Sequence, residues 1–226
     1  SDPMLLQSGI VPDVDGPIEF GLTFDARLVT VAGEAHEKRL IPVPLPAGWN
    51  QHTPRFSGMA FDSKRQRLLS AIRMGRETML ASLDIHRGSW TRLGRLPDAV
   101  FGIEYAAESD EVWVLGSDYV DSNQEASVRL LKLDAGGNVV HDVAVSPAVT
   151  MPVARVRAAD YRARHPAEAM LTSGMSQLVL VDGLAVLIGY RKTDTPGDEV
   201  CESHVIEPHS GNLLYANIAN INHGNA

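Results

Sequence analysis

The chain of 226 residues is long enough for one domain with a sizeable core and too short for two of comfortable size. Its formal net charge of −8 argues against nucleic acid or an anionic membrane as a partner, and no apolar run reaches the length of a membrane helix. The single cysteine, Cys201, excludes an internal disulfide and favours a cytoplasmic protein, although the residues before Met4 leave open whether a signal peptide was removed.

The first part of the chain predicts short strands. Residues 4–11 contain the run LLQSGIV, and residues 18–46 contain IEFGLTF, RLVTVAG and RLIPVPL. The last run carries prolines, which cannot donate to a β-ladder, so it is expected at a sheet edge. Two arrangements stay open: either the first unit has only three strands, or residues 4–11 complete it. The connection over 46–54 carries Trp49 near its middle.

The clearest unit spans residues 56–96. Its four strand-like runs, FSGMAFD, RLLSAIR, ETMLASLDI and SWTRLGRL, are separated by residues that favour turns. This unit recurs with the same landmarks. A glycine in the first run is followed by a large apolar residue, and these glycines are Gly21, Gly58, Gly102 and Gly174. An acidic residue and then a glycine form the last turn, at residues 84–88, 134–137 and 207–211. A four-stranded repeat near forty residues predicts propeller blades.

The repeat resembles the β-propeller families in general, over about residues 18–217, without the full motif of any one of them. The fold prediction is therefore an all-β protein, a small β-propeller of about four blades, each an antiparallel four-stranded sheet. The blades are expected at about 18–46, 56–96, 100–145 and 174–217. Phe61 and Tyr105, three residues after their glycines, are expected to pack between neighbouring blades.

A helical insertion is expected at about 154–170, before the last blade. The run ARVRAADYRARHPAEAML has helix-forming composition and basic residues that include Arg157 and Arg162. These arginines form either a solvated face or a site for an anionic ligand or partner. Two hairpin tips, 117–125 and 193–199, are polar and acidic, and they form either solvated excursions or contact surfaces.

The sequence contains no complete catalytic or metal-binding motif. Cys201 and His204 differ in parity on their strand, which argues against a metal set with His209. If the glycine-bearing runs are the innermost strands, the only carboxylates at the central channel are Glu19 and Glu104. Propeller lactonases of the gluconolactonase group, which this chain resembles in its blades, imply Glu, Asn and Asp around a divalent cation. The asparagine and the third carboxylate have no counterpart here.

The sequence-based functional prediction is a protein-binding propeller without enzymatic activity and without a cofactor, of the inhibitor or immunity type, that neutralises a basic protein partner. The binding residues expected from the tips, the loop and the insertion are Trp49, Asp118, Tyr119, Asp121, Glu125, Arg157, Arg162 and Asp198. One alternative is a metal-dependent hydrolase or lactonase with a channel site, in which Glu19 and Glu104 hold a divalent cation. The other alternative is a domain or subunit of a larger propeller assembly.

Overall fold

The computed structural model describes residues 5–11, 18–23, 27–32, 37–49, 55–74, 77–118, 128–147, 176–192 and 198–222. Every regular element in these ranges is a β-strand, and they form four sheets of four antiparallel strands. The expected helix at about 154–170 lies outside the described residues. No helix in the described part of the chain is long and apolar enough to cross a membrane.

The strands follow one another within each sheet in chain order. The first blade consists of β1 (Leu5–Val11), β2 (Ile18–Thr23), β3 (Arg27–Ala32) and β4 (Glu37–Pro42). The second consists of β5 (Arg55–Asp62), β6 (Arg67–Met74), β7 (Glu77–Asp84) and β8 (Ser89–Leu96). The third consists of β9 (Ala99–Ala106), β10 (Glu111–Ser117), β11 (Val128–Leu133) and β12 (Val139–Ala144). The fourth consists of β13 (Ser176–Val181), β14 (Leu184–Lys192), β15 (Asp198–Ile206) and β16 (Leu213–Asn222).

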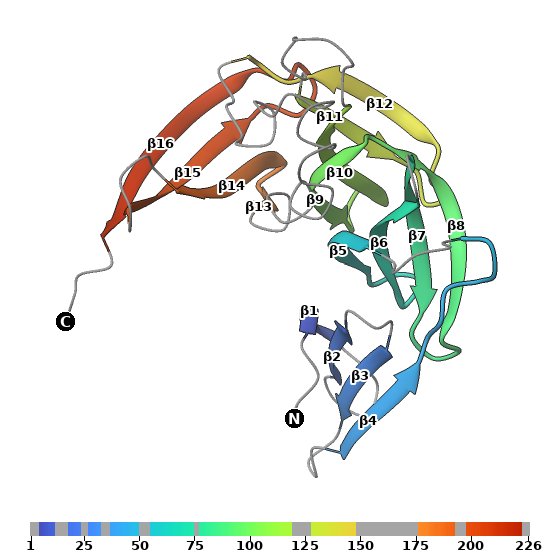
Figure 1. The fold of residues 1–226 in the computed structure, drawn as a ribbon. Helices are drawn as coiled ribbons and strands as arrows, with labels where there is room; N and C mark the ends of the chain where they lie inside the picture. Colours follow the sequence, from blue (N-terminus) through green and yellow to red (C-terminus); the bar gives the residue numbers. More distant parts are fainter. Residues whose placement is uncertain are drawn as a thin grey trace.

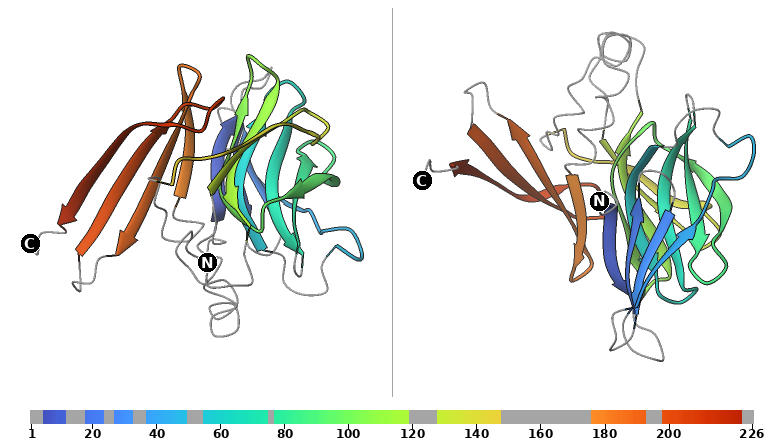
Figure 2. Two further views of the ribbon diagram at one scale, coloured as in Figure 1. Left: turned by 90° about the horizontal axis from the view of Figure 1, so that it is seen from above. Right: turned by 60° about the horizontal axis from the view of Figure 1, so that its bottom comes forward.

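The four blades stand along an arc, with β1, β5, β9 and β13 on its inner side (Figure 1). The arc is open between the first blade and the fourth, and both ends of the chain lie at this opening. In Figure 2 the fourth blade stands at the edge of the arc, and one side of its sheet is turned away from the third blade. The all-β fold of four-stranded antiparallel blades is therefore confirmed.

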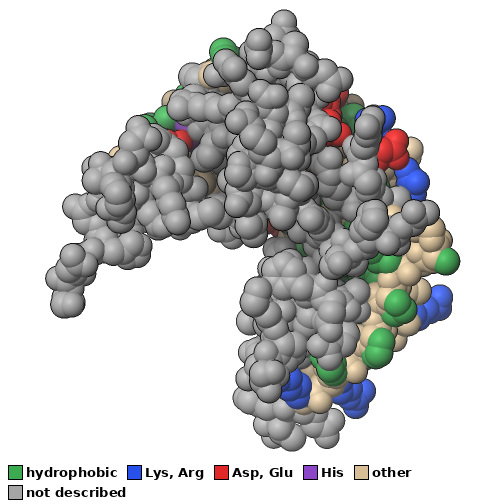
Figure 3. Space-filling view, in the orientation of Figure 1, with side chains coloured by type: hydrophobic (Ala, Val, Ile, Leu, Met, Phe, Trp, Pro, Cys, Tyr) green, Lys and Arg blue, Asp and Glu red, His purple; other side chains and the backbone are tan. Residues whose placement is uncertain are grey.

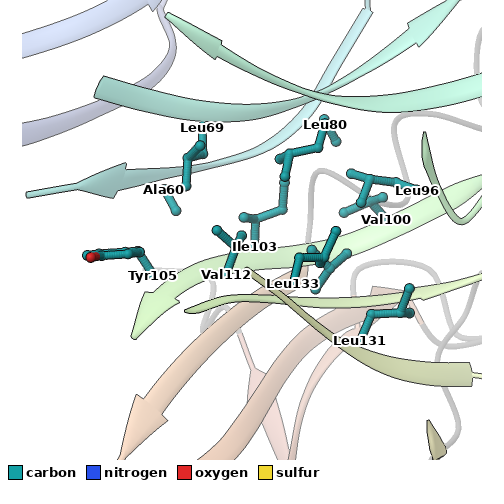
Figure 4. Close-up of a cluster of buried hydrophobic side chains, with 12 residues drawn as sticks. Ala60, Leu69, Leu80, Leu96, Val100, Ile103, Tyr105, Val112, Leu131 and Leu133 are labelled. Atoms are coloured by element: carbon teal, nitrogen blue, oxygen red, sulfur yellow. The ribbon is translucent and has the colours of Figure 1, made fainter. Parts of the chain in front are cut away.

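Three apolar cores hold the arc together, one between each pair of successive blades. Val43 of the first blade packs with Met59 and Leu68 of the second, and Phe101 of the third blade packs with Leu178 and Leu187 of the fourth. The core between the second and third blades is drawn in Figure 4, where Leu80 and Leu133 come from facing sheets. Because side chains alternate across a strand, the second and third sheets each supply one face to the blade before and the other to the blade after.

Tyr105 is buried in the core between the second and third blades, as expected, and Phe61 is half-buried against the core between the first and second. Hydrogen bonds between polar side chains also join the second and third blades. The carboxylate of Asp110 accepts hydrogen bonds from both Arg65 amino groups at 2.8 Å and from the Tyr105 hydroxyl at 2.7 Å. Arg65 holds the pKa of Asp110 well below its usual range, whereas burial and the bond to Asp110 raise the pKa of Tyr105 to about 12.

The glycine at position 102 permits a close approach between two inner strands. A Cβ atom placed there would lie 2.5 Å from the Leu178 Cβ and 2.8 Å from its backbone nitrogen. Any side chain at this position would push β13 away from β9. Gly102 therefore has a packing role, which is the role that glycine often has where two backbones meet.

The acidic residue and the glycine of the last turn also have defined roles. The Asp84 carboxylate accepts hydrogen bonds from the nitrogens of His86 and Arg87, and Glu207 accepts them from His209 and Ser210. The glycines have positive φ and pack on the outer strand of the preceding blade. Their contacts are Gly88 with Val43, Gly137 with Leu93, and Gly211 with Ala144.

Two parts of the sequence alignment are wrong in register. The innermost strand of the first blade is β1, and Gly21 lies on the second strand, β2, so residues 5–11 complete this blade. In the fourth blade, Leu180 pairs with Ala185 as Tyr105 pairs with Val112 in the third. Counting back from this pair places Gln177, rather than Gly174, at the position of Gly102.

Candidate functional site

Glu104 is a half-buried carboxyl on β9, the innermost strand of the third blade. Trp113 lies directly opposite it on β10, and Lys132 lies opposite Trp113 on β11. Residues that are directly opposite share one face of a sheet, so these three side chains form a row on the face that is turned toward the fourth blade. Trp113 is only 5% exposed, and it belongs to the core between these blades.

The surroundings of Glu104 favour its protonated form. Burial raises the pKa of this carboxyl, and the hydrogen bond that its Oε1 accepts from the Tyr105 nitrogen at 3.1 Å opposes the shift only in part. The Lys132 ammonium stacks on the Trp113 ring, 4.4 Å from its centre, so the indole stands between the cation and Glu104 in the row. A carboxyl in a partly apolar site keeps its proton to higher pH and is suited to donate it.

Glu19, the other carboxylate expected at the channel, lies on β2 and not on an innermost strand. The expectation that both carboxylates lie on innermost strands is therefore wrong for Glu19. Position on an innermost strand does not by itself place a side chain in the channel: Ala60 on β5 and Val100 on β9 are buried in the core between the second and third blades. Successive side chains of an inner strand point to opposite faces of the sheet. The position of a residue along the strand therefore decides which neighbouring blade its side chain contacts, and not whether it lines the channel.

Three of the expected binding residues fall within described strands or turns. Trp49 is half-buried against the core between the first and second blades, so packing accounts for much of its surface. Asp118 is exposed, and its Oδ1 accepts a hydrogen bond from the Asp98 nitrogen at 3.3 Å. Asp198 begins β15. The remaining residues of the expected set, Tyr119, Asp121, Glu125, Arg157 and Arg162, lie outside the described residues.

A buried polar set between the third and fourth blades was missed by the sequence analysis. Ser117, Glu202 and His204 are 0%, 3% and 3% exposed. Burial lowers the pKa of His204, although the charge of Glu202 opposes the shift. The signal for this set was the shared parity of residues 202, 204 and 206, because Ile206 belongs to the core. His209 is not part of it, since its ring stacks on that of His141 at 5.1 Å.

Among the described residues, no group of three His, Cys, Asp or Glu side chains is gathered in a way that could hold a metal ion. Two carboxyls lie on the described inner strands. Asp62 on β5 is paired with Arg65 at 3.1 Å and Arg67 at 2.8 Å, so Glu104 on β9, beside Trp113, is the candidate proton donor. It can transfer a proton at the inner side of the arc.

No protein-family model matches the sequence, and no curated protein matches it. Solved structures do match. An exo-β-1,3-galactanase from Phanerochaete chrysosporium, with β-1,3-galactotriose, aligns over 96% of this chain and 50% of its own, at 14% identity and a TM-score of 0.55. A proposed exo-β-1,3-galactanase from Bifidobacterium bifidum aligns over 96% of this chain and 72% of its own, at 13% identity and a TM-score of 0.50. The β-propeller domain of the Trilobed protease from Pyrococcus furiosus aligns over 98% of this chain and 58% of its own, at 7% identity and a TM-score of 0.44.

The four antiparallel four-stranded sheets, arranged along an arc with their first strands innermost, have the architecture of β-propeller blades. This chain spans half the length of the first galactanase. The comparison corrects the main functional prediction. A non-enzymatic binding protein of the inhibitor or immunity type is contradicted by the two structures above with a TM-score of 0.50 or more, which are described as exo-β-1,3-galactanases.

Proposed function

We propose that this protein is a hydrolase of glycosidic bonds in which Glu104 donates a proton to the leaving oxygen. The observation that carries the proposal is the raised pKa of this half-buried carboxyl on an innermost strand. The galactanases that share the fold act on β-1,3-linked galactose, as their descriptions state, and they support the choice of a glycoside as substrate.

The proposed step follows from the chemistry of glycosides. The bond between the anomeric carbon and the leaving oxygen breaks with its electron pair going to the oxygen, and the Glu104 proton neutralises the charge that develops there. A carboxyl with a raised pKa is protonated at a pH at which water or a second carboxylate can still act as nucleophile or base. Glycosidases commonly place that second carboxylate about 5–10 Å away. The proposal assigns only the acid.

The test compares the protein with its Glu104→Gln variant on aryl glycosides of galactose, xylose and arabinose. We expect hydrolysis of at least one sugar, and a loss of about 100-fold to 10,000-fold in kcat for the variant. The loss should nearly vanish with a dinitrophenyl leaving group, which departs without a proton. Glu108, exposed in the turn after β9, supplies the matched control Glu108→Gln, which should leave kcat unchanged.

Two results would contradict the proposal. One is the absence of hydrolysis for every sugar in the panel. The other is a Glu104→Gln variant that is as active as the unmodified protein on substrates with poor leaving groups.

A further inference from the structure

The fourth blade has one apolar face that packs on the third blade and one that packs on nothing described. Leu178 and Leu187, directly opposite each other, belong to the core with the third blade. The alternate residues Val179, Val186, Val205 and Tyr215 are opposite one another across β13, β14, β15 and β16, so they form a row on the other face. We call this the outer face of the fourth blade.

The row on the outer face is apolar, as the buried faces are, but it is open to solvent; beside it on the same face lie Ile188, Ser203 and Asn217. The row consists of three valines and a tyrosine; the valines are half-buried, and Tyr215 is 61% exposed. Val181, on the same face, is 49% exposed. Side chains of the core between the second and third blades are at most 8% exposed. The difference is therefore in what covers the sheet, and not in the sheet's own composition.

A second feature of the fourth blade is an exposed stretch of its outer strand, at the position where the earlier blades contact a turn of the next blade. Gly137 packs on Leu93, five residues after Gly88, and Gly211 packs on Ala144, seven residues after Gly137. The corresponding stretch of β16 is residues 216–218, five to seven residues after Gly211, and all three are exposed. No turn described in the structure packs there. The outer face and this stretch together correspond to the surface of each earlier blade that contacts the next blade in the chain.

The outer strands also differ in charge. β4 carries Glu37, Lys38 and Arg39, β8 carries Arg92 and Arg95, and β12 carries Asp142, whereas β16 (LLYANIANIN) has no charged residue. Basic side chains mark the rim formed by the first two blades at the right of Figure 3. A charged side chain on the outer strand would lose its hydration when another blade covers the sheet, and the ten residues of β16 include none.

We propose that the outer face of the fourth blade binds the first blade of a second copy of this chain. Three interfaces in the chain have the same form, in which one blade packs on the blade that follows it. In the described arc, the first blade is the one that follows no other blade. On β4, Ile41 faces the second blade, so Leu40, 45% exposed, lies on the opposite face with Lys38. The uncharged β16 presents no cation to repel that lysine. Two open arcs joined in this way have two equal contacts and can close a ring.

The first experiment measures the mass of the 226-residue protein by sedimentation over a range of concentrations. We expect a dimer of twice 24.5 kDa. Val186→Glu should raise its dissociation constant by about 100-fold or more, because an unpaired charge would enter an apolar contact. Val140→Glu is the matched control: Val140 is 55% exposed on β12, and the change should leave the dimer intact. A monomer at all concentrations, or a dimer that Val186→Glu leaves unchanged, would overturn the proposal.

The second experiment identifies the partner by a disulfide in a Cys201→Ser background. Leu40→Cys and Tyr215→Cys, placed in separate preparations that are then mixed, should form a cross-linked dimer on oxidation. With both cysteines in one chain, the expected product is again intermolecular. A monomeric product with an internal disulfide would show that the chain's own first blade covers the outer face, and it would rule out the second copy. These outcomes do not depend on any hydrolytic activity.

Discussion

The interface between the second and third blades and the outer face of the fourth blade are made from the same kind of sheet, yet they have different surroundings. At the first, twelve apolar residues are buried between two sheets, and Arg65 joins the blades through Asp110. At the second, Val186 and Val205 remain half-exposed. A blade therefore carries two apolar faces whether or not both are covered, and its stability comes from its neighbours, as in other repeat proteins.

The largest contrast should appear when one side chain is truncated on each side of the fourth blade. Phe101, 1% exposed, packs on the inner face, and we expect Phe101→Ala to cost about 3–5 kcal/mol in the free energy of unfolding. Val186→Ala, on the outer face, should cost less than about 1 kcal/mol in the monomer. Urea unfolding measures both. Equal losses would show that the outer face is covered after all. Phe61, for which the sequence predicts a similar loss, is half-buried, so we expect a smaller one.

Gly102→Ala tests the close contact between β9 and β13, the innermost strands of the third and fourth blades. Its Cβ would meet the Leu178 backbone, so we expect the third and fourth blades to separate at a cost of about 1–3 kcal/mol. The control is Gly136→Ala, in an exposed turn of the same blade, where the added atom would lie 3.3 Å from an Asp134 side-chain oxygen and 3.4 Å from the Asn138 side chain, and would meet no backbone atom within 4 Å. Thermal unfolding should distinguish the two variants. A Gly102→Ala protein as stable as the control would mean that the blades approach less closely than described.

Glu207 tests the turn by which the fourth blade docks on the third. Hydrogen bonds from the Ser210 hydroxyl and from the backbone nitrogens of Ser210 and His209 lower the pKa of Glu207 to about 2. A lowered pKa stabilises the folded state above the ordinary pKa of a glutamate, and the stabilisation is lost as the pH falls through about 2. Glu207→Ala should therefore lower the melting temperature at pH 6 and have progressively less effect below about pH 4. An effect independent of pH would assign the loss to packing.

The same comparison explains how far the sequence predicted the fold. The strand runs predicted in the second and third units fall on β5 to β12, where glycines, acidic turns and strand runs agree in the sequence. Packing explains the glycines at 88, 102 and 137. Gly21 misled the alignment, since a glycine on a second strand has the same sequence neighbours as one on an inner strand. In the fourth blade, the alignment used Gly174, which is three residues before Gln177, the residue that corresponds to Gly102. The register of this blade follows from the pairing of its strands, which the sequence alone does not show.

The candidate site was predicted only in part, for a similar reason. Glu104 was found because its repeat position was correct, and Glu19 was assigned wrongly with the register of the first blade. The Trp113 ring beside Glu104 depends on pairing between β9 and β10, which a single sequence does not show. Glu202 and His204 carried no motif, and their burial arises where two blades meet.

The smallest expected effect concerns Glu104, which lies in the covered interface at the position that Val179 occupies on the outer face. Burial raises the pKa of Glu104, so the folded protein binds this proton more tightly than the unfolded chain does. The resulting stabilisation is complete below the ordinary glutamate pKa and is lost as the pH rises through the raised value. Glu104→Gln, which is neutral at every pH, should therefore be more stable than the unmodified protein at pH 8 and no more stable at pH 3.5. Melting temperatures of both proteins across this range measure the difference, with Glu108→Gln as the exposed control. If the Glu104→Gln difference does not grow between pH 4 and pH 8, the carboxyl is solvated, and its assignment as a proton donor fails with it.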